Sequence, residues 1–302
     1  MARKLPYHLL DVFTDRRFCG NPLAVVEGAD ELTATEMQAI AREFNLSETV
    51  FLQSPQDPVN SARARIFTPQ KELPFAGHPT IGAAALLAET RAGDILARSD
   101  VVIVLEEEIG ALRCEALRGR NGVTYAQTAL PAAPRKIGES PAREALAAAL
   151  SLTPGEIGFG AHVPTIYSAG APFLFVPLQS REALDRARRG PTFADAVGEA
   201  IGAFLYTHDT VDFANAIHAR MYAHGLGIDE DPATGSAAAA FAGVAHEFER
   251  PDDGEHELFI EQGYAMGRPS RITLRMTVEN GALAVVAIGG QVVRVGEGAL
   301  RL

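Results

Sequence analysis

The sequence predicts a protein of two similar domains, each built from both β-strands and helices. Three observations lead to this prediction. The chain has 302 residues, which is about twice the length of a common domain. Segments with strand-like and helix-like patterns alternate along the chain. The order of strands, glycine turn and alanine-rich helix in the first half also recurs in the second half, at offsets of 150 to 158 residues.

The elements of the first half follow from local patterns. Thr33 and Glu36 have the spacing of a capping box, which predicts that a helix starts there. A turn rich in proline and glycine, residues 74–79, leads into a helix of mostly small residues. In chain order we expect strands at 8–13 and 22–26, a helix at 34–44, strands at 49–52 and 62–68, a helix at 80–89, and a hairpin of 101–105 with 110–117.

The second half contains weaker copies of the same segments. Gly170–Val176 resembles Gly20–Val26 at an offset of 150, and Ala219–Tyr222 resembles Ala64–Phe67 at an offset of 155. Three matches in the same order favour a duplication over a chance likeness of common strands and turns.

A second glycine turn, residues 231–236, opens a second alanine-rich helix at 237–244. Pairing Gly77 with Gly235 gives an offset of 158, whereas pairing Gly82 with Gly235 gives 153. These residues alone leave both alignments open.

The linker chemistry of residues 130–134 places the boundary between domains 1–130 and 131–302. Duplicated domains should pack face to face, and a cleft between domains is a common ligand site. The chain ends in three predicted strands, at 272–276, 283–286 and 291–295, of which the last could complete either domain. Residues 180–210 are predicted to be an insertion that the repeat does not need.

Composition excludes several classes of function. The formal net charge is −11, so we expect neither nucleic acid nor an anionic membrane surface as a partner. No apolar run approaches the roughly 20 residues that span a bilayer, and the N-terminus lacks a secretory apolar segment. Two cysteines, Cys19 and Cys114, cannot form a disulfide framework. These features predict a cytoplasmic protein.

The two glycine turns are the first candidate binding elements. Each precedes a helix whose first N–H groups are free and carry a partial positive charge. Glycine lets a ligand approach the backbone closely. Two such helix starts that converge would bind a small carboxylate, although each turn alone could be a purely structural helix start.

Three side chains next to these turns could move protons. His78 follows Gly77 between two prolines, where it could donate to a substrate, but it could also be a solvated loop residue. Asp231 precedes the second turn, where a helix N-cap is the simpler interpretation. Glu48 lies between a predicted helix and an apolar strand; burial there would favour its protonated form and suit a general acid/base, whereas an exposed loop position would not.

Other chemistries lack their residues. The sequence has no Walker loop, no dinucleotide-binding glycine motif and no nucleophile elbow. His218, His224, Asp229 and Asp231 are the nearest approach to a metal-binding cluster, but their spacing is not that of a zinc site. We therefore predict no metal site, and a metal-dependent hydrolase is the weakest alternative.

Taken together, the motifs resemble the phenazine-biosynthesis PhzF-like isomerase family, which has the diaminopimelate epimerase-like fold. The resemblance covers essentially the whole chain. The motifs that carry it are Asp11-Val12-Phe13-Thr14, Phe18-x-Gly20-Asn21-Pro22-Leu23-Ala24-Val25, Asn45-Leu46-Ser47-Glu48-Thr49, Arg65-Ile66-Phe67-Thr68-Pro69, Glu72-Leu73-Pro74-Phe75-Ala76-Gly77-His78-Pro79-Thr80 and Glu230-Asp231-Pro232-Ala233-Thr234-Gly235-Ser236-Ala237.

This resemblance implies an α+β fold of two pseudo-symmetric domains, each a curled, mostly antiparallel sheet around a central helix. It implies a homodimer, no cofactor and an active site in the cleft between the domains. Glu48 matches the family's acid/base carboxylate, His78 its cleft histidine and Asp231 its second-domain acid. The substrate-binding positions are Gly77, Gly235, Ser236 and Asn21, which favours the 158-residue offset.

The expected activity is therefore a cofactor-independent isomerisation in which Glu48 moves a proton on a small carboxylate-bearing metabolite. Diaminopimelate epimerases use two opposed thiols, but neither Cys19 nor Cys114 lies in the two glycine turns, which disfavours a two-thiol racemase. The alternatives are an epimerase or racemase of an amino-acid-like substrate and a non-catalytic small-molecule binding protein.

Overall fold

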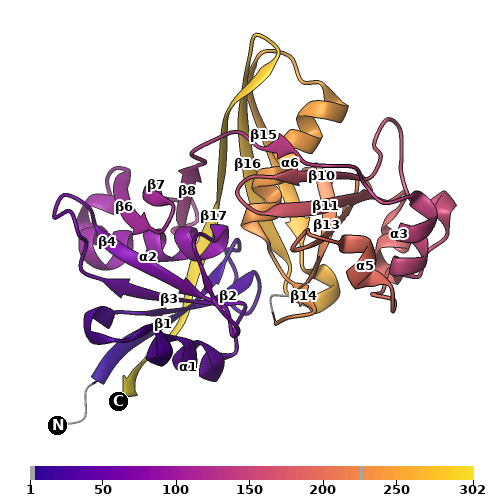
Figure 1. Cartoon of the computed structure of the whole chain (residues 1–302). Helices are drawn as coiled ribbons and strands as arrows, with labels where there is room; N and C mark the ends of the chain where they lie inside the picture. The colour runs from indigo at the N-terminus through magenta and orange to yellow at the C-terminus, as the bar shows by residue number, and fades with distance from the viewer. Residues whose placement is uncertain (1–3, 225–226) are drawn as a thin grey trace. The chain divides into compact units, whose positions relative to one another are not determined.

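A computed structural model describes residues 4–224 and 227–302 (Figure 1). Their contacts divide the chain into two compact units. One unit consists of the residues up to Ala129 together with Gly289–Leu302, and the other of Leu130–Ile288. None of the helices in the described ranges is both long and apolar enough to cross a membrane.

The first unit is a sheet around one central helix. β2 and β3 are parallel and are connected through α1, and β4 and β6 are parallel and are connected through α2. The pairings of β1 with β2 and β17, of β3 with β4, of β4 with β5, and of β7 with β6 and β8 are antiparallel. Its elements are β1 (Lys4–Val12), β2 (Asn21–Val26), the 3-10 turn η1 (Ala29–Glu31), α1 (Ala34–Phe44), β3 (Glu48–Gln53), β4 (Ala62–Phe67), β5 (Glu72–Leu73), α2 (Gly77–Leu96), β6 (Val101–Glu107), β7 (Gly110–Arg118), β8 (Thr124–Ala129) and the end of β17 (Ala282–Arg301).

The start and end of α1 are fixed by its own sequence. Thr33 caps the helix by accepting the N–H of Glu36, whose carboxylate in turn accepts the N–H of Thr33, as predicted. Asn45 ends the helix in the left-handed region with φ of 50°. Because Glu48 begins β3 only three residues later, this sharp stop determines where the Glu48 side chain lies.

The central helix α2 is buried on all sides over residues 77–88. It contacts β1, β2, β3, β6, β7 and β8 of the same unit, which explains its continuous run of small and apolar residues. At Gly82 an added Cβ would lie 2.4 Å from Cδ2 of Leu23 and 2.9 Å from Cγ2 of Val12, so a side chain there would displace two fully buried residues. The helix starts at Gly77, three residues before the predicted start, because Ala76 is the last extended residue.

The second unit repeats this arrangement with an additional helix near its start. β11 and β12 are parallel and are connected through α4 and α5. β13 and β15 are also parallel, and α6 lies in the segment that connects them. Its elements are β9 (Arg135–Lys136), α3 (Arg143–Leu150), η2 (Pro154–Glu156), β10 (Thr165–Ser168), β11 (Pro172–Pro177), α4 (Arg181–Arg186), α5 (Phe193–Val197), β12 (Gly202–Thr207), β13 (Ile217–Ala223), β14 (Glu230–Asp231), α6 (Gly235–Glu249), β15 (Gly254–Gln262), η3 (Tyr264–Met266), β16 (Ser270–Glu279) and the start of β17.

The two units align at an offset of 158 residues around their central helices. β5 and β14 begin 158 residues apart, as do α2 and α6. An ion pair is also repeated: Arg65 binds Glu72 through two contacts of 2.6 and 2.7 Å, and Arg220 binds Glu230 through two of 2.9 Å. The alternative offset of 153 is therefore wrong, because it would pair a residue inside α2 with the first residue of α6.

Two expectations from the sequence need correction. Residues 180–210 are not an insertion, because α4 and α5 connect β11 to β12 as α1 connects β2 to β3. The additional length of the second half lies earlier, in α3. The two strands expected at 283–286 and 291–295 are one continuous strand, β17, whose final residues pair with β1 in the first unit.

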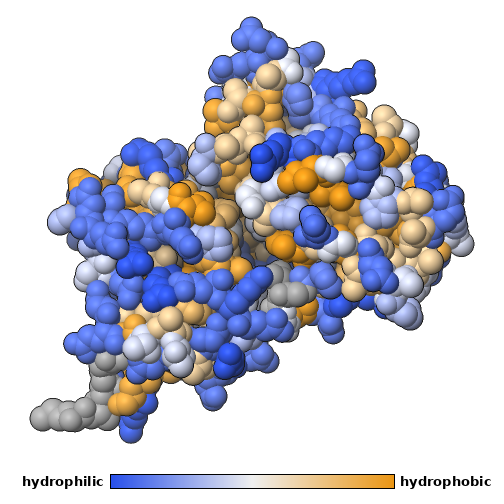
Figure 2. All heavy atoms as spheres, viewed as in Figure 1, coloured by the Kyte–Doolittle hydropathy of each residue, from blue (hydrophilic) through white to orange (hydrophobic). Residues whose placement is uncertain are grey.

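Each unit has its own apolar core. A cluster in the first unit packs Met37 and Ile40 of α1 against Phe51 and Phe67 of the sheet. A cluster in the second unit packs Leu146 of α3 with residues of α4, α5 and the neighbouring strands. On the face shown in Figure 2, hydrophilic residues predominate and hydrophobic residues reach the surface in smaller patches.

Candidate active site

In the first unit, three of the predicted site residues lie together because each begins a secondary-structure element. Asn21 is the first residue of β2, Glu48 is the first residue of β3, and His78 is the second residue of α2. Since β2 and β3 are parallel neighbours, their first residues lie at the same edge of the sheet. Nδ1 of His78 lies 3.3 Å from Nδ2 of Asn21 and 3.4 Å from Oε2 of Glu48.

These three side chains are withdrawn from solvent. The His78 side chain is 4% exposed and that of Glu48 12%, so neither residue is the exposed loop residue that the sequence left open. Burial lowers the pKa of His78 to about 3, because the charged imidazolium is poorly solvated there. His78 is therefore a neutral imidazole at every pH near neutrality.

Nε2 of His78 is the ring nitrogen that could bind a ligand. When Asn21 donates an amide N–H to Nδ1, the ring proton is on Nε2. Nε2 is buried and has no hydrogen-bond partner among the residues that the structure describes. A buried polar group left in this state costs about 1–3 kcal/mol, so a ligand acceptor at Nε2 would be bound favourably.

The start of α2 offers backbone donors beside this histidine. The N–H of Thr80 makes the first bond of the helix, to the carbonyl of Ala76 at 3.2 Å. The N–H groups of Gly77 and His78 precede that bond, at the positive end of a helix of 20 residues. This is the backbone arrangement that binds carboxylates at helix starts.

A buried acid that the sequence analysis missed holds this helix start. Oε1 of Glu107 lies 2.6 Å from Oγ1 of Thr80, which donates to the carbonyl of Ala76 at 2.8 Å. Burial raises the pKa of Glu107 to about 8, so the acid is mostly protonated at neutral pH, and its Oε1 accepts the hydroxyl of Thr80. The strand pattern could have located Glu107, because Val101, Ile103 and Leu105 alternate inward and Glu107 continues their register.

In the second unit, Asp231 lies in β14 and is buried. Its Oδ2 accepts the hydroxyl of Thr234 at 2.6 Å, and its carbonyl accepts Nε2 of Gln262 at 2.7 Å. The N-cap residue of α6 is Thr234, so the interpretation of Asp231 as the N-cap is wrong. Gln262, which is fully buried and also accepts the N–H of Thr234, was missed because its role depends on contacts across 28 residues or more.

Gly235 and Ser236 are the first two residues of α6. At the 158-residue offset they correspond to Gly77 and His78. The first bond of α6 joins the N–H of Ala238 to the carbonyl of Thr234 at 2.9 Å, so the N–H groups of Gly235 and Ser236 precede it, as the corresponding groups do in α2. Both helix starts thus present the same backbone donors.

The residues considered for a metal site do not form one. Nδ1 of His218 binds Oε1 of Glu261 at 2.7 Å in a buried pair, and Asp229 pairs with Arg189 on the surface. Among the described residues, the group with metal-binding geometry is a different one, His162 with His208 and Glu249.

Residues 10–298 match the profile of a family described as Phenazine biosynthesis-like protein. The chain belongs to this family. A relative from Mesorhizobium japonicum, named as an uncharacterized isomerase, is 47% identical over 300 residues, which cover 97% of this chain and 98% of the relative.

Two further members of the family are similar over almost their whole length. The trans-2,3-dihydro-3-hydroxyanthranilate isomerase of Pseudomonas chlororaphis is 34% identical over 303 residues, covering 98% of this chain and 99% of the relative. The crystal structure of a phenazine biosynthesis protein of the PhzF family from Bacillus anthracis matches with a TM-score of 0.87 at 27% identity, covering 99% of each chain. The predicted fold class and the prediction of a PhzF-like isomerase are confirmed.

Proposed function

We propose that this protein isomerises a small carboxylate-bearing metabolite by moving one proton, without a cofactor, and that Glu48 carries the proton. The observation that supports this most is the position of the Glu48 carboxylate, 3.4 Å from the ring of a buried neutral histidine. Glu48 removes a proton from one carbon and returns it to another as the double bond shifts. No proton or electron is gained or lost overall.

The neighbouring groups have distinct roles in this proposal. Asn21 positions the ring of His78 through Nδ1, and Nε2 of His78 donates to a polar group of the substrate. Asp231 exchanges a proton with a hydroxyl or amine of the substrate. In this proposal the backbone N–H groups of Gly77, Gly235 and Ser236 bind its carboxylate.

The relatives suggest the first compound to assay. Several of them are trans-2,3-dihydro-3-hydroxyanthranilate isomerases at 33 to 34% identity. An anthranilate has the carboxylate that the helix starts would bind. We therefore propose a dihydroanthranilate-like acid as substrate class, and assay of trans-2,3-dihydro-3-hydroxyanthranilate as the starting point.

The test is the variant Glu48→Gln, which keeps the side-chain shape and removes the base. In heavy water the wild type should incorporate deuterium at the carbon that becomes protonated. Because a general acid/base supplies about 10²- to 10⁴-fold of the rate, the variant should be slower by that factor. Glu43→Gln, at an exposed position of α1, serves as the matched control and should keep the wild-type rate.

If Glu48→Gln incorporates deuterium into the product at the wild-type rate, Glu48 is not the acid/base of the reaction. Label at an inverted stereocentre, instead of at a new carbon, would establish an epimerase. Binding of the acids without turnover by the wild type would establish a binding protein.

A further inference from the structure

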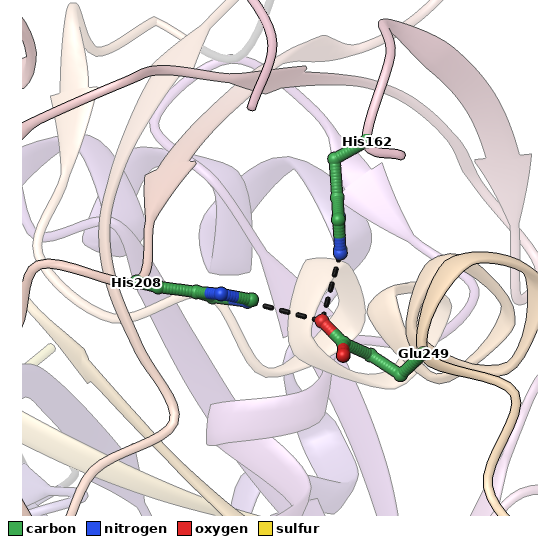
Figure 3. A group of neighbouring side chains, drawn as sticks. All are labelled: His162, His208 and Glu249. Atoms are coloured by element: carbon green, nitrogen blue, oxygen red, sulfur yellow. Dashed lines mark hydrogen bonds and ion pairs between the residues drawn. The ribbon is translucent and has the colours of Figure 1, made fainter. Parts of the chain in front are cut away.

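The second unit contains three metal-ligating side chains that come from separate segments and meet at one point (Figure 3). His162 precedes β10, His208 directly follows β12, and Glu249 is the last residue of α6. Oε1 of Glu249 lies 2.7 Å from Nε2 of His162 and 3.1 Å from Nε2 of His208. One ligand atom of each residue lies within 4.8 Å of the other two.

The ring of His162 is held in one orientation. Its side chain is only 5% exposed, and it stacks on Phe159 at a centroid distance of 4.6 Å, with Phe248 at 5.0 Å. Nδ1 lies 2.9 Å from the hydroxyl of Tyr206, so Nε2 is the nitrogen that faces Glu249. Metal-binding histidines are commonly oriented in this way by a hydrogen bond at the other ring nitrogen.

The charge of this cluster suits a metal site. The carboxylate of Glu249, which both histidine rings face, provides the negative charge that a divalent cation needs.

One side of the cluster is accessible. The His208 and Glu249 side chains are 47% and 46% exposed, so an ion and a water molecule can reach them. In a tetrahedral zinc site the ligand atoms are about 3.3 Å apart, given zinc bonds of about 2.0–2.2 Å. The two observed separations, 2.7 and 3.1 Å, are shorter than that value by about 0.6 and about 0.2 Å, so the side chains would have to move apart slightly to hold the ion.

We propose that His162, His208 and Glu249 form a binding site for a divalent transition-metal ion of the Zn²⁺ type, with water as the fourth ligand. Two imidazoles and one carboxylate are a ligand set that zinc prefers. The ion would link the loop before β10, the end of β12 and the end of α6, and so stabilise the second unit. None of the three residues takes part in the proposed isomerisation.

The test uses the full chain without a histidine tag, freed of metal with a chelator and titrated with Zn²⁺ by calorimetry. We expect one equivalent to bind and the thermal midpoint of unfolding to rise. Co²⁺ used as a spectroscopic probe should give the visible absorption of a tetrahedral complex. His208→Ala and Glu249→Gln change half-exposed side chains, so both variants should fold, and each should weaken Zn²⁺ binding at least tenfold.

His256→Ala is the matched control, because His256 lies in β15 of the same unit and bonds only the carbonyl of Asp252 in the described contacts. This variant should bind Zn²⁺ as the wild type does. If the wild type does not bind Zn²⁺, or if it and both site variants bind Zn²⁺ equally, the three residues are only a hydrogen-bonded cluster. This readout does not depend on isomerase activity.

Discussion

The buried carboxyl of Glu107 should make the protein less stable as the pH rises. Its pKa is about 8 in the folded protein and 4.5 without burial. Below pH 4.5 the acid is protonated in both the folded and the unfolded state, and its full contribution is present. Between these values the unfolded chain releases the proton while the folded protein keeps it, so the free energy of unfolding falls by about 1.4 kcal/mol per pH unit.

Summed over this interval, the loss is at most about 5 kcal/mol, complete once the pH passes the folded-state pKa. Glu107→Gln should abolish it, because glutamine stays neutral at every pH. Its amide oxygen can still accept the hydroxyl of Thr80, as Oε1 of Glu107 does at 2.6 Å. We therefore expect the variant and the wild type to be similarly stable at pH 5, and the variant to be more stable by several kcal/mol at pH 8.

The measurement is urea unfolding followed by circular dichroism at half-unit steps from pH 5 to pH 9. Glu108→Gln is the control, because Glu108 is the exposed neighbour of Glu107 and its replacement should change stability by no more than about 0.5 kcal/mol. If the stabilities of wild type and Glu107→Gln run parallel across this range, the carboxyl is not a buried neutral acid.

Three further predictions concern packing, capping and reactivity. Gly82→Ala should destabilise by about 1–2 kcal/mol, because its Cβ would lie 2.4 Å from Leu23 and overpacking outweighs the gain of about 1 kcal/mol in helix propensity. Gly93→Ala in the same helix meets nothing within 4 Å and should not destabilise; equal urea midpoints for the two variants would contradict this difference. Thr33→Ala removes the capping box and should lower the free energy of unfolding by about 1 kcal/mol. Urea unfolding measures this change, and an unchanged midpoint would mean that the cap contributes nothing. Cys114 is buried with its pKa raised to about 12, so mass spectrometry should find it unmodified by iodoacetamide at pH 8 until the protein is unfolded, and rapid alkylation of the native protein would argue against this burial.

Features that depend on neighbouring residues could be predicted from the sequence. The capping box of α1, most strands, the duplication and the two glycine turns follow from spacings of a few positions. Glu48, His78 and Asp231 were predicted as site residues in the same way, because each lies next to a break between elements. The boundaries were less accurate: α2 starts at Gly77 only because Ala76 remains extended, which depends on the short strand β5 pairing with β4.

Features that depend on contacts between residues far apart in the chain could be seen only in the tertiary structure. The residues alone left the alignment of the two halves open, and the pairing of β5 with β4 and of β14 with β13 fixes it at 158 residues. The role of residues 180–210 became evident only from the parallel pairing of β11 and β12. Glu107 and Thr80 are 27 positions apart, and His162 and Glu249 are 87 apart. No local pattern encodes such contacts, because they form only when the sheet brings the ends of distant elements together and burial then changes the protonation of the side chains that meet there.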